Sequence, residues 1–160
     1  MIEVRQPTPV DLDALADILN AFELDCDPEG LQCWVAVESG TDGDAKVIGG
    51  VLVDFDYGDY GSTVPSGHGD NHPFIFAIAV ASEGQRKGAG RALMRRVAEG
   101  AHAAGLSFLV LMPQERRADD ASEHIAFFRA CGLNALAPEQ HMSPYGASVL
   151  EILERLRLDS

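Results

Sequence analysis

The segment VASEGQRKGAGRAL, residues 80–93, brings three glycines and two adjacent cations together directly after the apolar run FIFAIAV. Glycine-rich turns between a strand and a helix often bind phosphate, because the helix N-terminus presents unpaired N–H groups and partial positive charge. Arg86, Lys87 and Arg91 would add full positive charges at such a turn. The spacing therefore predicts a phosphate-binding turn followed by a helix.

Two frequent phosphate-binding motifs do not match this segment. A P-loop requires GxxxxGK[ST], and GQRKGAGR lacks the Lys followed by Ser or Thr. A dinucleotide fingerprint requires GxGxxG, but Leu93 stands where the third glycine would follow Gly88 and Gly90. ATP, GTP and NAD are therefore disfavoured as ligands. A glycine turn that only packs a helix on a sheet is a further alternative, but it does not explain the clustered cations.

The charge distribution narrows the classes of partner. The net charge is -13, which argues against nucleic acid and against anionic membranes as partners. Five of the 12 Lys and Arg residues lie between positions 86 and 96, and none lies between 47 and 85. The positive charge is therefore concentrated in one region of an otherwise acidic chain.

Length and composition predict one soluble domain. With 160 residues and 46% hydrophobic content, the chain can bury a core as a single domain over residues 1–160. It contains neither a leader-like start nor an apolar run of membrane-spanning length, so we expect an intracellular, cytoplasmic protein. Cys26, Cys33 and Cys131 lack metal-site spacing and are interpreted as reduced packing residues.

The first part of the chain alternates strand and helix signals. Residues 2–6 indicate a strand, and Thr8, Pro9 and Asp11 form a capping-box pattern that begins a helix. The helix has an apolar face that excludes Asp11, Asp13 and Asp17; its members are Leu12, Leu15, Ile18, Leu19 and Phe22. A turn at 27–30 follows, and then two strands, 32–38 and 46–55, joined by the hairpin signal SGTDGD.

The second part continues the same alternation. A polar loop over 56–71 precedes a central strand over 72–80 that is apolar on both faces. A helix runs from Gly90 to near Gly105 with Ala89, Leu93, Val97 and Ala101 on one face, and 107–112 is a buried strand. Another helix, capped by Asp119 or Asp120, places Ile125 and Phe128 in the core and ends at Gly132. The run VLEILERL fits either a last strand or a short helix.

Two segments resemble one known family. IAVASEGQRKGAGRAL is similar to the acetyl-CoA-binding signature of the GNAT superfamily of N-acetyltransferases, with Gln85, Gly88 and Gly90 at its three defined positions. Downstream, HIAFFRACGL resembles the family's helix ending in A-x-x-F-Y-x-x-x-G-F. With the order of strands and helices, the resemblance spans nearly the whole chain.

The resemblance implies an α/β, GNAT-like (acyl-CoA N-acyltransferase) fold, a mixed six- or seven-stranded sheet flanked by about four helices. It also implies acetyl-CoA as co-substrate, with the acetyl group moving to a primary amine by direct attack on the thioester. A homodimer is possible, since family members often dimerise. The implied cofactor-binding residues are Ile78, Ala79 and Val80 for pantetheine, and Gln85, Arg86, Lys87, Gly88, Ala89, Gly90 and Arg91 for the pyrophosphate. A backbone N–H near Ile78 or Ala79 would stabilise the tetrahedral intermediate.

The catalytic residues depart from the family pattern. Phe128 stands where the family commonly has the Tyr that protonates the thiolate, and Ala121 stands where an Asn is frequent. His72 is the first candidate for the base, because it shares the parity of Phe74, Phe76 and Ile78 on the central strand; it could equally just end a loop. Tyr57, Tyr60 and Tyr145 are the available acids, and Tyr145 is preferred because the family's tail usually closes over the site. Glu115 is another possible base, or simply a solvated residue.

The acceptor is predicted to be cationic. Asp54, Asp56, Asp59 and Asp70 lie without any Lys or Arg among them, so their summed field favours an amine, and Asp54, Asp56 and Tyr57 are the candidate substrate-binding residues. A loop without substrate contact remains an alternative, as does metal binding by His68, Asp70 and His72, although no metal is predicted. The acceptor could be a small amine or a peptide or protein amino group. A catalytically weak or inactive acyl-CoA-binding sensor or partner module remains the alternative function.

Overall fold

The computed structural model describes residues 2–22, 30–40, 43–58, 64–65, 67–69, 71–85, 87–113, 125–139 and 143–158. The chain forms two compact units, one of Met1–Asp54 with Phe76–Val97 and one of Phe55–Ile75 with Ala98–Ser160. Among the described residues, no helix is both long and apolar enough to cross a membrane.

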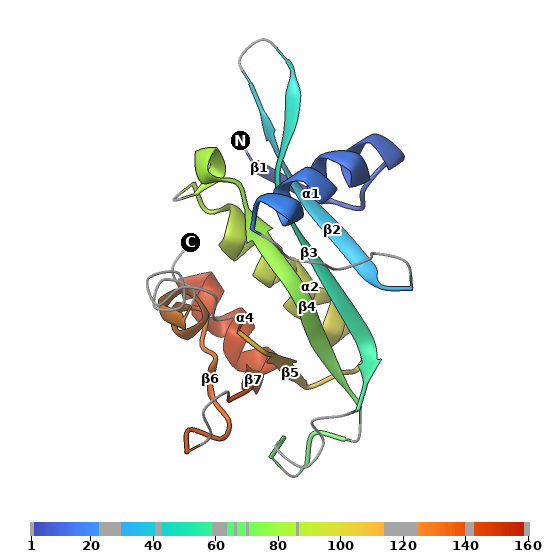
Figure 1. Cartoon of the computed structure of the whole chain (residues 1–160). Helices are drawn as coiled ribbons and strands as arrows, with labels where there is room; N and C mark the ends of the chain where they lie inside the picture. The colour runs from blue at the N-terminus through green and yellow to red at the C-terminus, as the bar shows by residue number, and fades with distance from the viewer. Residues whose placement is uncertain are drawn as a thin grey trace. The chain divides into compact units, whose positions relative to one another are not determined.

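Seven strands follow the order β1-β2-β3-β4-β5-β7-β6 in one sheet (Figure 1). Their bounds are Ile2–Arg5 for β1, Gln32–Ser39 for β2, Ala45–Tyr57 for β3, His72–Val80 for β4, Phe108–Leu111 for β5, Asn134–Ala135 for β6 and Tyr145–Ser148 for β7. β4 and β5 pair in parallel, whereas β1–β2, β2–β3, β5–β7 and β6–β7 pair antiparallel. The helices are α1 (Pro9–Ala21), α2 (Ala89–Ala103), α4 (Val149–Leu158) and a helical segment at 125–130. The predicted mixed sheet is confirmed with seven strands.

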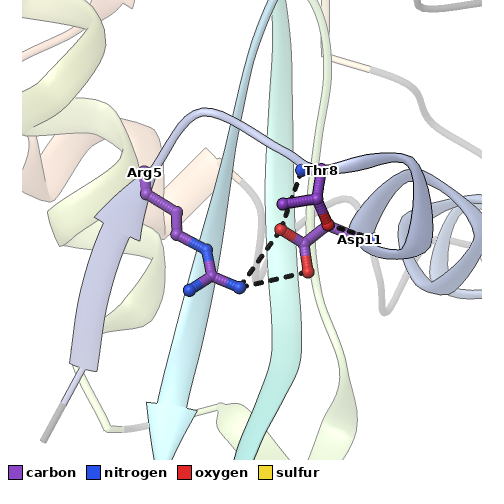
Figure 2. A network of polar contacts seen from close by, with 3 residues as sticks. All are labelled: Arg5, Thr8 and Asp11. Atoms are coloured by element: carbon purple, nitrogen blue, oxygen red, sulfur yellow. Dashed lines mark hydrogen bonds and ion pairs between the residues drawn. The ribbon is translucent and has the colours of Figure 1, made fainter.

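Helix α1 begins at the predicted capping box. The Thr8 Oγ1 accepts the Asp11 N–H at 3.2 Å, and the Asp11 carboxylate accepts the Thr8 N–H at 3.0 Å. Arg5, at the end of β1, adds its Nη2 at 3.2 Å from both carboxylate oxygens (Figure 2). Only 6% of the Asp11 surface is exposed, although the sequence placed this residue outside the apolar face of the helix. Burial alone would raise the pKa of Asp11, but the Thr8 N–H and the Arg5 guanidinium together hold it below the ordinary value of 3.8.

The core of the first unit lies between α1 and the strands beside it. Leu15 and Leu19 pack with Val35, Val37 and Leu52 in one buried cluster, and α1 crosses β2 and β3 in Figure 1. The other predicted members of the apolar face, Leu12, Ile18 and Phe22, are partly buried against the same cluster, which confirms the face. A Cβ added at Gly50 would lie 2.5 Å from a Leu15 methyl, so the close packing of α1 on β3 depends on this glycine.

The β2–β3 hairpin contains a bulge. Ala36 pairs with Gly49 but Val37 pairs with Val47, so Ile48 is an extra residue in β3. Ile48 is only 1% exposed, which means that the bulge points a large side chain into the interior. The predicted hairpin is confirmed, with the Gly40 N–H bonded to the Asp44 carbonyl at 2.7 Å, although residues 41 and 42 lie outside the described part.

The second unit is built on β5, β7, β6 and α4. Its cluster of buried residues contains Val64, Phe74, Phe108 and Val110. Strands β6 and β7 were not predicted, because segments of two and four residues are too short to show an alternating apolar pattern. A Cβ at Gly146 would lie 2.7 Å from the Leu109 carbonyl oxygen, so this glycine permits the pairing of β7 with β5. VLEILERL is helical in α4.

Two glycines end helices as predicted. Gly105 has φ 78° and Gly132 has φ 102°. In both cases the N–H of the residue after the glycine donates to the carbonyl five residues earlier, the Schellman pattern that satisfies the last carbonyls of a helix.

One predicted boundary was wrong. The loop predicted from residue 56 begins later, because β3 continues through Tyr57, whose ring stacks on Phe74 with centroids 4.5 Å apart. The predicted caps Asp119 and Asp120 and most of the turn at 27–30 lie outside the described residues.

Candidate active site

The last half of β4 leads into the predicted phosphate-binding turn. Ala77 and Ala79 belong to the buried cluster beneath α1, so Phe76, Ile78 and Val80 face the other side of the strand. Phe76 is 37% exposed, so this strand is apolar on both faces, as predicted, but is not fully buried on the face that carries Phe76. The described pairs of β4 with β5 are Phe74–Val110 and Ile75–Leu111, and β4 then continues to Val80. The backbone of Ile78, Ala79 and Val80 thus lies past the last described pair.

The bulge in β3 anchors the start of the turn. The Ala81 N–H donates to the Ile48 carbonyl at 2.7 Å, and a Cβ added at Gly84 would lie 2.9 Å from the Ile48 Cβ. On the same strand, a Cβ at Gly49 would lie 2.7 Å from the Ala79 carbonyl oxygen. The site therefore depends on Ile48 and Gly49, which sequence reasoning missed. The glycine pair inside a predicted strand was the available signal, because strand glycines often mark bulges or close backbone approach.

The turn itself is closed by the signature residues. A short 3₁₀-helix, η1 (Ser82–Gly84), leads to Gln85, whose Nε2 donates to the Val80 carbonyl at 3.2 Å. Gly88 has φ 87°, a conformation that favours glycine, and its carbonyl accepts the Ala92 N–H at 3.0 Å as α2 begins. Gln85 thus ties the turn to β4, and Gly88 sets the direction of α2.

The N-terminus of α2 suits an anion. The first N–H groups of a helix have no intrahelical acceptor, and α2 has no acidic residue in its first turn. Helix α2 packs against the core through its predicted apolar face, whose members are all buried: Ala89, Leu93, Val97 and Ala101.

The cations of the turn do not all share one environment. Arg91 is half-buried, whereas Lys87 is exposed and its Nζ lies 3.1 Å from the Glu38 Oε1 on β2. Sequence reasoning missed Glu38, since a partner 49 residues away leaves no local signal. Arg86 lies outside the described residues.

In the second unit, the candidate base lies among aromatic rings. His72 is 1% exposed, and its ring meets that of Tyr57 edge-on with centroids 6.0 Å apart. Tyr57 in turn stacks on Phe74. The structure therefore brings together His72 and Tyr57, which were predicted for different roles.

The candidate acceptor residues on β3 do not share one face. Asp54 is half-buried and Asp56 is exposed, and both have the same strand parity. Tyr57 has the opposite parity, so its side chain leaves the other face of the strand. Asp56 accepts a hydrogen bond from Asn71 Nδ2 at 2.7 Å. These residues therefore divide into an acidic pair and an aromatic group.

The candidate acid is buried in the sheet. Tyr145 is the first residue of β7, where it pairs with Leu111 and Ala135, and it is 7% exposed. Phe128, which replaces the family's usual Tyr, is also buried, at 6% exposure.

Comparison with known proteins decides the family. The profile described as the acetyltransferase (GNAT) family matches residues 2–133. This chain belongs to the GNAT family of acetyltransferases. A search of curated proteins finds no match to the sequence.

Solved structures resemble this GNAT acetyltransferase in fold. Arabidopsis thaliana NAA60 in complex with acetyl-CoA gives a TM-score of 0.70 at 16% identity, over 92% of this chain and 97% of the other. Ard1 from Thermoplasma volcanium gives 0.65 at 18%, over 94% and 99%. The ribosomal-protein-S18-alanine N-acetyltransferase from Escherichia coli gives 0.59 at 16%, over 93% and 94%. The GNAT fold predicted from the two motifs is confirmed.

Several predicted residues of this acetyltransferase are not described by the structure, namely Arg86, Asp59, Tyr60, Asp70, Glu115, Ala121 and Cys26. Of the suggested metal-binding trio, His68 lies with its Nδ1 3.0 Å from the Ser107 Oγ, and His72 lies against Tyr57. Among the described residues, no three His, Cys, Asp or Glu side chains gather as a metal site. Cys33 and Cys131 are buried thiols.

Proposed function

We propose that this GNAT acetyltransferase moves an acetyl group from acetyl-CoA to a cationic primary amine by direct attack of the amine on the thioester. The observation that carries the proposal is the junction from β4 to α2. This junction contains, in order, a turn anchored to β3, Gly88 with φ 87°, and the N-terminus of α2, whose first turn has no acidic residue. The first-turn N–H groups of α2 would bind the pyrophosphate, with Lys87, Arg91 and Arg86 adding charge.

The strand before the turn would hold the pantetheine arm. Ile78, Ala79 and Val80 lie beyond the last described pair of β4 with β5. Their backbone groups would hydrogen-bond to the amides of pantetheine, like those of an added strand. An N–H near Ile78 or Ala79 would then donate to the oxygen that becomes negatively charged as the amine attacks.

Two proton transfers accompany the reaction. An alkyl ammonium has a pKa of about 10.4, so it must lose a proton before it attacks, and the departing thiolate must gain one. We assign the first transfer to His72, directly or through water, and the second to Tyr145. Both side chains are buried, and a buried group exchanges protons only with the ligand or water that reaches it.

The acceptor proposal rests on charge. Asp54 and Asp56 lie on one face of β3, in a stretch of sequence without Lys or Arg, so their field attracts a cation. Tyr57 lies on the opposite face, so one substrate cannot contact its ring and the acidic pair together, and the acceptor proposal rests on Asp54 and Asp56 alone. The acceptor is a small primary amine or the amino group of a peptide or protein; the likeness to the E. coli ribosomal-protein acetyltransferase supports testing the second.

A second candidate function is an acyl-CoA-binding module without turnover. The observation that favours it is Phe128, which has no proton to give at the position of the family's usual acid. An enzyme releases free CoA with some amine, whereas a binding module holds acetyl-CoA unchanged.

Donor binding is tested first by isothermal titration with acetyl-CoA, CoA and NADH. We expect micromolar binding of both CoA species, no binding of NADH, and loss of binding in an Arg86→Glu/Lys87→Glu double variant. The matched control reverses two exposed arginines of α4, Arg155→Glu/Arg157→Glu, and should bind as the wild type does. Failure of the wild type to bind either CoA species contradicts the proposal.

Acceptor chemistry is then tested by thiol release over three amines. These are putrescine, a peptide with a free α-amino group, and an N-terminally blocked peptide with one lysine. Release with one of them supports the acetyltransferase and identifies the acceptor class. Tight acetyl-CoA binding without release from any of the three favours the binding module.

A further inference from the structure

We propose that Glu38 competes with the phosphates of the donor for Lys87 and so lowers the affinity of the turn for anions. The inference rests on the proposed donor site and assigns a role to a residue on another strand. Its basis is the 3.1 Å contact between the Lys87 Nζ and the Glu38 Oε1. Lys87 lies two positions before the first residue of α2, inside the turn.

The two partners differ in freedom of movement. Glu38 is near the end of β2, where it pairs with Ile2 on one side and with Lys46 on the other, so its backbone is fixed by two neighbouring strands. Lys87 has a four-carbon stem and its side chain is 48% exposed. When the pair breaks, the Glu38 backbone stays in place and keeps the carboxylate near the turn, whereas the longer Lys87 side chain can move to a ligand.

The ion pair between Lys87 and Glu38 is weak enough for the phosphates of a ligand to displace Glu38. Exposed ion pairs contribute little to stability, because water screens them and both side chains lose freedom. A pyrophosphate carries more charge than one carboxylate, and the N-terminus of α2 attracts it as well. The phosphates therefore displace Glu38 from Lys87, while the carboxylate remains nearby and repels them.

The charge pattern around α2 supports this assignment. Acidic side chains are commonly placed in the first turn of a helix, where they offset its partial positive charge, and α2 has none there. The carboxylate that meets this turn comes from β2 instead. A carboxylate on a separate strand can give way to a ligand without disturbing the helix.

The test compares acetyl-CoA affinity among the wild type, Glu38→Gln, Lys87→Gln and the double variant, all by titration at low salt. Removing the Glu38 charge should tighten binding about three- to tenfold, from the loss of one like charge several ångströms from the phosphates. Lys87→Gln should weaken binding, and Glu38→Gln should gain less in the Lys87→Gln background. The gain should shrink at high salt, because screening weakens charge interactions.

Two controls isolate the effect. Glu3→Gln removes the same charge from an exposed position on β1 and should leave the affinity unchanged. S-Acetyl-pantetheine, which lacks phosphates, should bind the wild type and Glu38→Gln equally.

The outcomes separate this inference from the proposed function. If the wild type does not bind acetyl-CoA, the donor site itself fails. If the wild type binds and Glu38→Gln binds equally or more weakly, or if Glu3→Gln tightens binding as much, the role of Glu38 is refuted while the donor site stands.

Discussion

Replacing Gly84 with alanine should uncouple the turn from its anchor in β3. The added Cβ would lie 2.9 Å from the Ile48 Cβ, 3.1 Å from its Cδ1 and 3.3 Å from its Cγ1. Ordinary carbon contacts lie at about 3.5–4.0 Å, so one side must move by about 0.6 Å or more. Ile48 is 1% exposed within the sheet and has little room to yield. The turn is therefore the part that moves.

The displacement of the turn in Gly84→Ala should lower both the stability of the protein and its affinity for acetyl-CoA. Overpacking of this kind costs about 1–3 kcal/mol of stability, and each kcal/mol lowers Tm by about 2–4 °C in a chain of this size. The displaced turn also misaligns its N–H groups with the pyrophosphate. We expect the affinity for acetyl-CoA to fall about tenfold, equivalent to about 1.4 kcal/mol.

The assay pairs calorimetric titration with thermal unfolding and uses Gly43→Ala as a matched control. Gly43 has φ 86° and a Cβ there meets nothing within 4 Å, so alanine adds backbone strain of about 1–2 kcal/mol without a clash. It should lower Tm and leave acetyl-CoA affinity unchanged. If Gly84→Ala lowers Tm but binds acetyl-CoA as tightly as the wild type does, the anchoring argument is wrong.

Two further predictions concern the helix cap and the proposed acid. Asp11→Asn should lower stability at neutral pH by about 1.5–3 kcal/mol, the range for hydrogen bonds to charged groups. The folded-state pKa of Asp11 lies below 3.8, so the carboxylate's contribution is complete above that value and disappears as the pH falls through the folded-state pKa. Urea unfolding should therefore show wild type and variant converging in acid, and a constant gap contradicts this. Tyr145→Phe should lower kcat at least about a hundredfold, the effect of losing a general acid, with acetyl-CoA affinity unchanged; an unchanged kcat removes Tyr145 from the mechanism.

The sequence predicted features that depend on neighbours within about one helical turn. The capping box of Thr8 and Asp11 and the helix ends at Gly105 and Gly132 all form where the pattern places them. Such features join residues only a few positions apart, so their signal survives in a short window of sequence. The signature around Gly88 belongs to this class too, because a strand, a glycine turn and a helix start follow one another directly.

The tertiary structure alone decided which distant residues complete the site. Glu38 reaches Lys87 across 49 positions, and Ile48 meets Gly84 only because a bulge inserts it into β3. The contact of Arg5 with the Asp11 carboxylate is a similar case, because the sequence pattern indicated only the capping role of Asp11. These contacts form only when strands pair and helices pack, so a short window of sequence does not show which distant residues will meet. The sequence by itself thus determined the family and the strand–turn–helix order around Gly88, whereas the fold decided which residues anchor that turn and that Glu38 contacts Lys87.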